Sequence, residues 1–199
     1  GELSAIHAEN NPQGLAFADD TGAELTWSEF EDRSVEVACA LSEHVRHRDR
    51  VAFVTESTVD TAAFWNGCLK AGAITSFAHT QSAPETMRYT IDQLQPEVLV
   101  VHESFSEFVH DRVWDGLESD PLVVVLGEAT YDYERSLETF LASGGREPDT
   151  YVRADDIGAV IWTSGTTGKP KGWCHTYEGL RTKAGSRDVV IDRTGTRMT

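Results

Sequence analysis

The 199-residue chain contains few cysteines, few lysines and no long apolar run. Its three cysteines, Cys39, Cys68 and Cys174, lie far apart and form no C-x-x-C pair, which argues against a disulfide framework and indicates a reducing compartment. No segment approaches the roughly 20 apolar residues that span a bilayer. The N-terminal Gly-Glu-Leu-Ser also lacks the charged-then-apolar pattern of a secretory signal. We therefore expect a cytoplasmic protein without a membrane span.

Basic residues are also scarce, because 17 lysines and arginines face 33 aspartates and glutamates, giving a formal charge of −16. Nucleic acids require a basic surface, so this balance argues against a nucleic-acid partner. The acidic residues are spread along the chain, and its lysines are Lys70, Lys169, Lys171 and Lys183. This combination favours a salt-adapted protein, since high salt screens like-charge repulsion. An acidic protein of an ordinary cytoplasm is the alternative.

Two kinds of apolar pattern alternate along the chain and predict its fold class. Short apolar runs, typical of strands, occupy residues 50–55, 73–78, 98–101, 122–126 and 157–162. Segments with helical spacing occupy residues 26–45, 57–71, 82–96, 104–117 and 133–142. Unbroken runs such as VLVV and LVVVL suit strands that are buried on both faces of a parallel sheet. We predict an α/β fold, a largely parallel sheet with flanking helices.

Two of the expected helices begin with recognisable signals. Thr26-x-x-Glu29 has the spacing of a capping box, in which the two side chains bond to each other's backbone N–H. Ser82-x-x-Glu85 repeats that spacing, and Pro84 lies where proline is favoured in a first helical turn. These signals predict helix starts close to residues 27 and 84.

The last apolar run leads into residues 162–172, which read WTSGTTGKPKG. Glycines allow the backbone to turn and to approach a ligand closely, and exposed N–H groups in such a turn form an anion-binding concavity. Hydroxyls add donors and lysines add charge. We therefore predict a polyphosphate-binding loop at residues 163–171, a solvent-accessible turn after a central strand. An ordinary glycine-rich surface turn is the alternative.

The loop does not have the G-x-x-x-x-G-K-[ST] spacing of a Walker A motif or the G-x-G-x-x-G spacing of a dinucleotide fingerprint. It resembles the phosphate loop of the adenylate-forming, or AMP-binding, superfamily, which reads roughly [YFW]-T-S-G-[ST]-T-G-x-P-K-G. Upstream segments resemble the family in the right order, among them LTWSEFEDRSVEVACAL, RDRVAFV and FWNGCLKAGAI. The resemblance covers about residues 14–180. It is of the acyl-CoA synthetase type and implies the N-terminal portion of the family's large domain.

The resemblance implies a reaction and assigns roles to the loop. The family activates a small carboxylic acid with ATP to an acyl-adenylate, and coenzyme A is the expected acceptor of the acyl group. The residues implied to contact the ATP phosphates are Thr163, Ser164, Gly165, Thr166, Thr167, Gly168 and Lys171. Lys171 is the implied catalytic residue, whereas Lys169 occupies a variable position of the family pattern and is expected to be solvated.

Several parts of the family pattern are missing from the chain. There is no Y-G-x-T-E segment, whose glutamate would hold Mg²⁺, and no later aspartate motif for the ribose. We therefore interpret residues 1–199 as an incomplete N-terminal AMP-binding domain without the C-terminal domain, with the Mg²⁺ ligands outside this chain. Alone it is expected to be inactive. The alternatives are an adenylation domain of a peptide-synthetase module and a non-catalytic polyphosphate-binding module.

Polar residues beside the loop leave further alternatives open. His175 either lies near the acyl or nucleotide pocket or has a structural hydrogen-bonding role, and the latter is favoured. Asp155 and Asp156 match the acidic lead-in to the family's loop strand and are expected to be solvated. The pair His44 and His47 is interpreted as part of a cationic helix end rather than an anion site.

Overall fold

The computed structural model describes residues 2–163, 169–185, 190–191 and 197–198. Its main feature is a seven-stranded sheet with the order β7-β6-β5-β3-β4-β8-β9. Neighbouring strands are parallel, except that β8 and β9 form an antiparallel pair. The strands are β3 (Arg50–Val54), β4 (Ile74–Phe77), β5 (Val98–His102), β6 (Leu122–Leu126), β7 (Glu134–Ser136), β8 (Ile157–Thr163) and β9 (Lys171–Thr176). The predicted fold class, a largely parallel α/β sheet, is confirmed.

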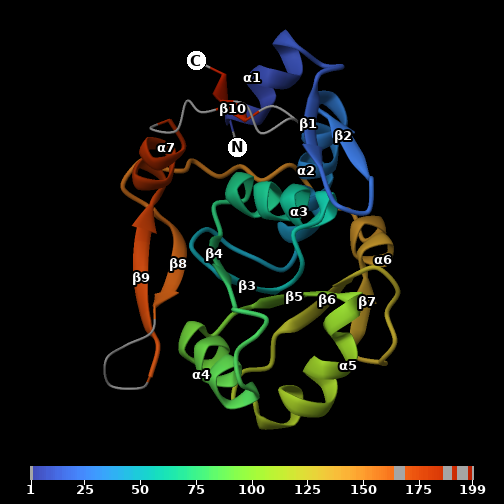
Figure 1. Cartoon of the computed structure of the whole chain (residues 1–199), viewed down its shortest axis with the longest axis vertical. Helices are drawn as coiled ribbons and strands as arrows, with labels where there is room; N and C mark the ends of the chain where they lie inside the picture. Colours follow the sequence, from blue (N-terminus) through green and yellow to red (C-terminus); the bar gives the residue numbers. More distant parts are fainter. Residues whose placement is uncertain (1, 164–168, 186–189, 192–196, 199) are drawn as a thin grey trace.

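Helices cover both faces of this sheet, as Figure 1 shows, with α2, α3 and α6 on one side and α4 and α5 on the other. The helices are α1 (Glu2–Asn10), α2 (Trp27–Leu41), α3 (Val59–Lys70), α4 (Pro84–Leu94), α5 (Glu103–Arg112), α6 (Leu137–Ala142) and α7 (Tyr177–Gly185). A 3-10 turn, Trp114–Gly116, follows α5. Two short antiparallel ribbons pair β1 (Leu15–Ala18) with β2 (Glu24–Thr26), and β10 (Val190–Ile191) with β11 (Arg197–Met198).

The central strands contribute to a separate apolar core on each face. Along β3, Val51 and Phe53 pack with α2, α3 and α6, whereas Ala52 and Val54 pack with α4 and α5. This alternation follows from the two-residue period of a strand. It explains why these strands have no polar face in the sequence, since a parallel sheet with helices on both sides exposes neither face to water.

Both helix-start predictions locate their helices correctly, but by different means. At α2 the capping box is complete: Glu29 N donates to Thr26 Oγ1 at 3.3 Å, and Thr26 N donates to Glu29 Oε2 at 2.8 Å. At α4 the cap residue is Ala83 and makes no side-chain hydrogen bond, so the predicted Ser82 capping box is wrong. Pro84 is the first residue of that helix, as expected from its fixed φ and missing N–H.

Other predicted elements require correction. Residues 133–142 are not one helix, because β7 precedes α6 and Ser136 caps α6 by accepting a hydrogen bond from Thr139 N at 3.2 Å. The buried Glu134 accepts hydrogen bonds from Thr130 N and Tyr131 N, which fixes the turn into β7. The strand that leads to the loop, β8, is next to the edge strand β9 and is not central.

Candidate functional site

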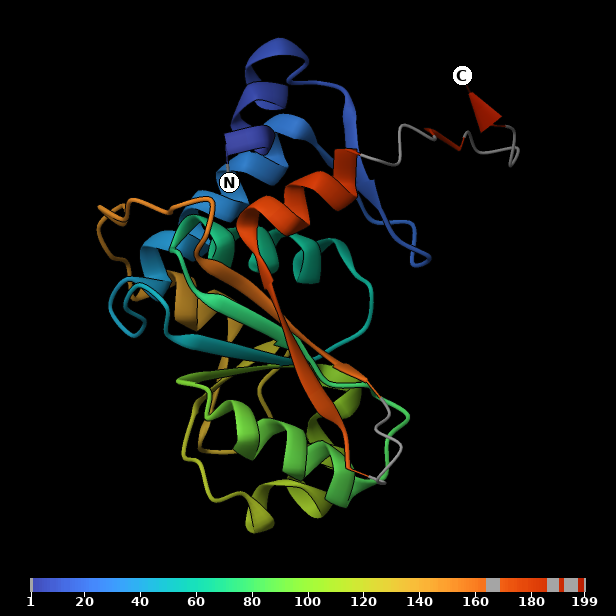
Figure 2. The same cartoon turned by 90° about the vertical axis from the view of Figure 1, so that its left-hand side faces the viewer.

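The two ends of the predicted phosphate loop are joined by the β8–β9 hairpin. Thr163, the last residue of β8, is paired with Lys171, the first residue of β9, and Thr163 Oγ1 donates weakly to Lys171 O at 3.4 Å. Figure 2 shows the hairpin running from α7 at one end toward the side of α4 at the other. Of the implied phosphate contacts, the structure thus brings Thr163 and Lys171 together, and both are exposed. The other five, residues 164–168, lie outside the described residues.

Hydroxyl groups of β4 attach the hairpin to the sheet. The parallel register of β4 and β8 pairs Thr75 with Ala159. Thr75 Oγ1 donates to Gly158 O at 3.0 Å, and Ser76 Oγ donates to Val160 O at 2.9 Å. Each hydroxyl also accepts a hydrogen bond from an indole N–H, Thr75 from Trp65 and Ser76 from Trp162, at 3.1 and 2.9 Å.

Three of these hydrogen bonds join β8 to β4 through side chains, and the fourth, from Trp65, joins α3 to β4. A hydroxyl can donate once and accept at the same time, so each one is used in both roles. The consequence is that the strand ending at Thr163 has a defined position relative to the sheet. The indole of Trp162, directly before Thr163, is held by the same network.

The start of β8 is held by a buried carboxylate, which corrects the expectation that Asp156 is solvated. Its side chain is 1% exposed and forms an ion pair with Arg48, and His47 Nε2 lies 3.2 Å from Asp156 Oδ2. Arg153 N donates to the same oxygen at 2.9 Å. The basic segment around His47 is therefore a partner of the strand entry, because a buried carboxylate must be paired and hydrogen-bonded.

The contact between Asp156 and Arg48 makes the free energy of unfolding depend on pH. The Arg48 guanidinium, followed by the Arg153 N–H, lowers the pKa of Asp156 below its ordinary value. A pKa that is lower in the folded state gives stability that is present above the unfolded pKa, near 3.9, and is lost as pH falls through the folded pKa.

We expect the free energy of unfolding to fall more steeply below about pH 4 in the native chain than in Asp156→Asn. Urea denaturation across this pH range tests the prediction, with Asp20→Asn, at an exposed position, as the control. An equal pH dependence of the native chain, Asp156→Asn and Asp20→Asn would contradict it.

Positive charge gathers at the exit of the loop. Lys169 and Lys171 both have exposed side chains, and in the part of the chain that the structure describes neither forms an ion pair with a carboxylate. The Lys169 ammonium lies 5.1 Å from the centroid of the Tyr89 ring on α4. The expectation that Lys169 is merely solvated is therefore incomplete, since it has an aromatic partner.

The element after the loop is a strand, not a helix. In nucleotide-binding loops of the Walker A and Rossmann types, the anion sits at the N-terminus of the helix that follows, and the helix dipole favours it. Here β9 follows, and α7 begins only at Tyr177. Six residues of strand separate that helix start from the loop by about 20 Å. The dipole of α7 therefore cannot supply a positive field at the loop, and the lysines that the structure describes there are Lys169 and Lys171.

An exposed apolar row lies on the same face of the hairpin as Thr163 and Lys171. Ile161 is paired with Trp173, two residues before Thr163 and two after Lys171, so all four side chains share one face. The register of β4 brings Phe77 level with Ile161. Phe77, Ile161 and Trp173 are 44%, 47% and 62% exposed. This face thus offers apolar contacts directly beside the charged end of the hairpin.

Three residues after the loop, His175, Cys174 and Tyr177, have different surroundings. His175 is on β9, on the face that carries Lys171 but four residues further along, and it is partly buried. Cys174 is exposed and lines the groove beside α4. Tyr177 has a structural role, because its hydroxyl lies 3.2 Å from the carbonyl oxygens of both Leu69 and Ala73 and burial raises its pKa.

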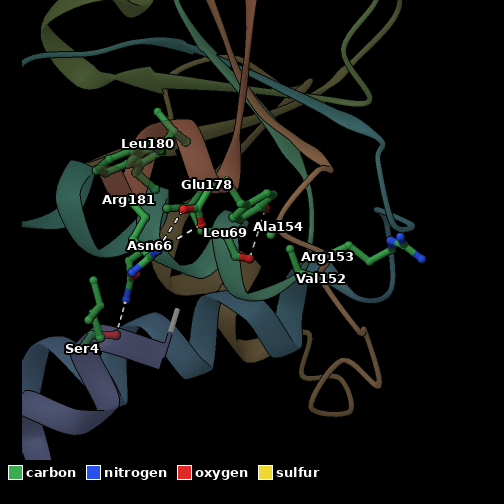
Figure 3. A pocket seen from close by; sticks show the side chains of 12 residues that line it. Ser4, Asn66, Leu69, Val152, Arg153, Ala154, Glu178, Leu180 and Arg181 are labelled. Carbon is green, nitrogen blue, oxygen red and sulfur yellow. Dashed lines mark hydrogen bonds and ion pairs between the residues drawn. The ribbon is translucent and has the colours of Figure 1, made fainter. Parts of the chain in front are cut away.

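A second hollow, of about 420 Å³, lies between α1, α3 and α7. Figure 3 shows Asn66 directed toward Ser4, to which its Nδ2 donates at 2.9 Å, and Arg153 extending away from the other labelled side chains. Arg181 is already paired with Glu178 at 2.9 Å. Because its cations are paired or directed away, this hollow lacks the charge that a polyphosphate requires. It had no signal in the sequence, since its walls come from helices far apart along the chain.

Among residues that the structure describes, no three histidine, cysteine, aspartate or glutamate side chains gather closely enough to hold a metal ion. Within the same residues, no helix combines the length and the apolar character needed to cross a membrane.

Comparison with known proteins identifies the family. The model of the AMP-binding enzyme family matches residues 5–197, nearly the whole chain. The chain therefore belongs to the AMP-binding enzyme family. The loop residues that carry the resemblance lie inside the matched range, at the tip of the hairpin described above.

Curated relatives are CoA ligases. The chain is 28% identical over 158 residues to a 3-hydroxybenzoate–CoA ligase of Aromatoleum sp. (strain CIB), covering 77% of this chain and 29% of that protein. It is 27% identical over 196 residues to the long-chain-fatty-acid–CoA ligase FadD13 of Mycobacterium tuberculosis (strain H37Rv), covering 96% and 38%. The chain thus spans about a third of the length of these relatives.

Solved structures share the fold. The anthranilate CoA ligase AuaEII in complex with anthranoyl-AMP superposes with a TM-score of 0.79 at 24% identity, covering 94% of this chain and 37% of that one. The N-terminal domain of FACL13 from M. tuberculosis superposes with a TM-score of 0.78 at 20% identity, covering 96% and 48%. This chain therefore has the fold of about half of that N-terminal domain.

Proposed function

We propose that the chain is the phosphate-binding, N-terminal part of an ATP-dependent carboxylate–CoA ligase, and that residues 1–199 form an incomplete AMP-binding domain. The observation that carries the proposal is the pairing of Thr163 with Lys171 at the tip of an antiparallel hairpin, with the family's glycine-rich loop between them. The lysine charge at this tip, which forms no ion pair with any carboxylate that the structure describes, supports binding of an anion. The curated relatives, which are CoA ligases, support the activity.

In this proposal Lys171 stabilises the leaving pyrophosphate. A carboxylate oxygen attacks the α-phosphorus of ATP, the bond from that phosphorus to the bridging oxygen breaks, and negative charge builds on the departing pyrophosphate. A fixed cation directed at this charge stabilises the transition state more than the ground state. Thr163, Ser164, Thr166 and Thr167 would donate hydrogen bonds to the phosphates, and Gly165 and Gly168 would allow the backbone to approach them.

The remaining parts of the proposal concern partners and setting. Coenzyme A is the proposed acyl acceptor, a small carboxylic acid the substrate, and Mg²⁺ the metal, with its ligands outside this chain. We place the protein in the cytoplasm and regard its acidic composition, −16 in formal charge, as a salt adaptation. A peptide-synthetase adenylation domain fits the same loop, but the relatives' names favour the CoA ligase.

Binding of inorganic tripolyphosphate by the 199-residue chain tests the proposal. Titration followed by the backbone amide signals in NMR should show saturable shifts. Lys171→Ala should weaken binding by about 10- to 100-fold, because a charged hydrogen bond is lost. Tyr151→Leu, at an 86% exposed side chain, is the control and should bind as the native chain does.

The same chain should not catalyse carboxylate-dependent pyrophosphate exchange, because the Mg²⁺ and ribose motifs of the family are missing from it. Exchange above a Lys171→Ala control would contradict the assignment of the Mg²⁺-binding and ribose-binding groups to segments outside this chain. Binding that is unaffected by Lys171→Ala would instead contradict the phosphate site itself.

A further inference from the structure

The contact between Lys169 and Tyr89 links the loop exit to a helix on the far side of a groove. The ammonium nitrogen lies 5.1 Å from the ring centroid, within the roughly 6 Å range of cation–π attraction. Tyr89, Trp162, Pro170 and Lys171 all line this groove of about 480 Å³ between α4 and the hairpin. A lysine at a position that the family pattern leaves variable thus has a specific partner in this chain.

The three residues from Lys169 to Lys171, here called the arm, are restricted in conformation. Because Lys169 precedes a proline, the helical region is disfavoured for its backbone, and the chain bends at this residue. Pro170 has a fixed φ. Lys171 is held by its pairing with Thr163 at the end of β8. A restraint on the Lys169 side chain is therefore transmitted along few rotatable bonds to the residue that carries the proposed catalytic charge.

Tyr89 is itself well supported. Its helix, α4, is fixed to the sheet by the buried side chains of Met87, Ile91 and Leu94, and its ring is partly buried on the groove side. The opposite wall is equally fixed, because the Trp162 indole N–H donates to Ser76 Oγ at 2.9 Å. The arm therefore spans two rigid supports, α4 through Lys169 and β8 through Lys171.

We propose that Tyr89 is a positioning residue for polyphosphate binding, acting through Lys169 to hold Lys171 toward the phosphates. This inference rests on the proposed function. Without the ring, residues 169–171 are held only by the pairing of Lys171 with Thr163. The conformational freedom that they gain must then be lost again when the anion binds, which weakens binding. A cation–π contact at an exposed site corresponds to about two- to fivefold in a binding constant, so this is the expected size of the effect.

Substitutions at both partners test the inference by NMR titration of the 199-residue chain with inorganic tripolyphosphate. Tyr89→Leu should weaken binding about two- to fivefold, whereas Tyr89→Phe, which keeps the aromatic face, should bind within about twofold of the native chain. Lys169→Arg should also bind nearly normally. Adding Tyr89→Leu to Lys169→Gln should have no further effect, because the ring then has no cation to hold. The single variant Lys169→Gln alters an exposed residue, so its affinity does not depend on how α4 tolerates leucine.

Three results would overturn the inference. Equal affinities of Tyr89→Leu and Tyr89→Phe would show that the aromatic face is irrelevant. Tighter binding by Tyr89→Leu would show that the ring withholds Lys169 from the phosphates. An equal loss from Tyr89→Leu in the Lys169→Gln background would show that Tyr89 acts without the lysine. All three differ from failure of the proposed function, in which Lys171→Ala itself has no effect.

Discussion

Replacing Lys171 by alanine in the full-length ligase that we propose is expected to slow adenylation by about 10²–10³-fold, or roughly 3–4 kcal/mol. The reason is that β9 separates α7 from the loop, so the dipole of α7 does not assist and one preorganised cation carries a large share of the charge stabilisation at the leaving pyrophosphate. Carboxylate binding should change little, because the effect belongs to the transition state. Pyrophosphate exchange at saturating carboxylate measures the rate.

Lys169→Ala is the matched control, because it removes the same charge two residues away. Its expected loss is only about two- to fivefold, the value of the contact with Tyr89. If Lys169→Ala proved the more damaging change, the roles of the two lysines would be reversed. If neither change slowed exchange, the hairpin tip would not be the phosphate site.

Phe53→Ala is expected to cost about 3–5 kcal/mol of unfolding free energy, as truncation of a large buried aromatic generally does. Phe53 is fully buried on β3, at the middle of the sheet. Its ring stacks on Phe77 at 4.5 Å and meets Phe64 edge-on at 6.0 Å. Urea denaturation measures the change, and Tyr151→Ala, at an exposed site, should stay within about 0.5 kcal/mol of the native value. A loss below about 1 kcal/mol would show that the core on the side of α2, α3 and α6 tolerates the truncation better than its packing indicates.

The parallel sheet was predictable because its strands and helices have signals that are local. Runs such as residues 98–101 and 122–126 are apolar throughout, and the Thr26 capping box marks a helix start within four residues. Elements that depend on contacts between residues outside one local pattern were predicted less well. At residues 133–142 an apolar period suggested a single helix, while the buried carboxylate of Glu134 organises a turn and a strand there.

At the candidate site, too, local features could be predicted from the sequence and contacts between distant residues could not. The composition of residues 162–172 indicated the ligand chemistry without reference to structure. The hairpin geometry was not foreseen, because β9 reads KGWCHT, with no alternation that distinguishes it from a loop. The partners of Asp156 and Lys169 lie 108 and 80 positions away, at Arg48 and Tyr89. Contacts at such separations follow from strand order, which a single sequence does not reveal.

The strand that follows the loop has a chemical consequence. A helix dipole is a property of the backbone, and no side-chain modification can remove it. At this hairpin the charge resides instead on the exposed ammonium groups of Lys169 and Lys171. Acetylation of a lysine abolishes its charge and its cation–π contact together. In the proposed phosphate site, acetylation of Lys171 would therefore remove charge that the anion needs, whereas no such modification removes the dipole of a helix N-terminus.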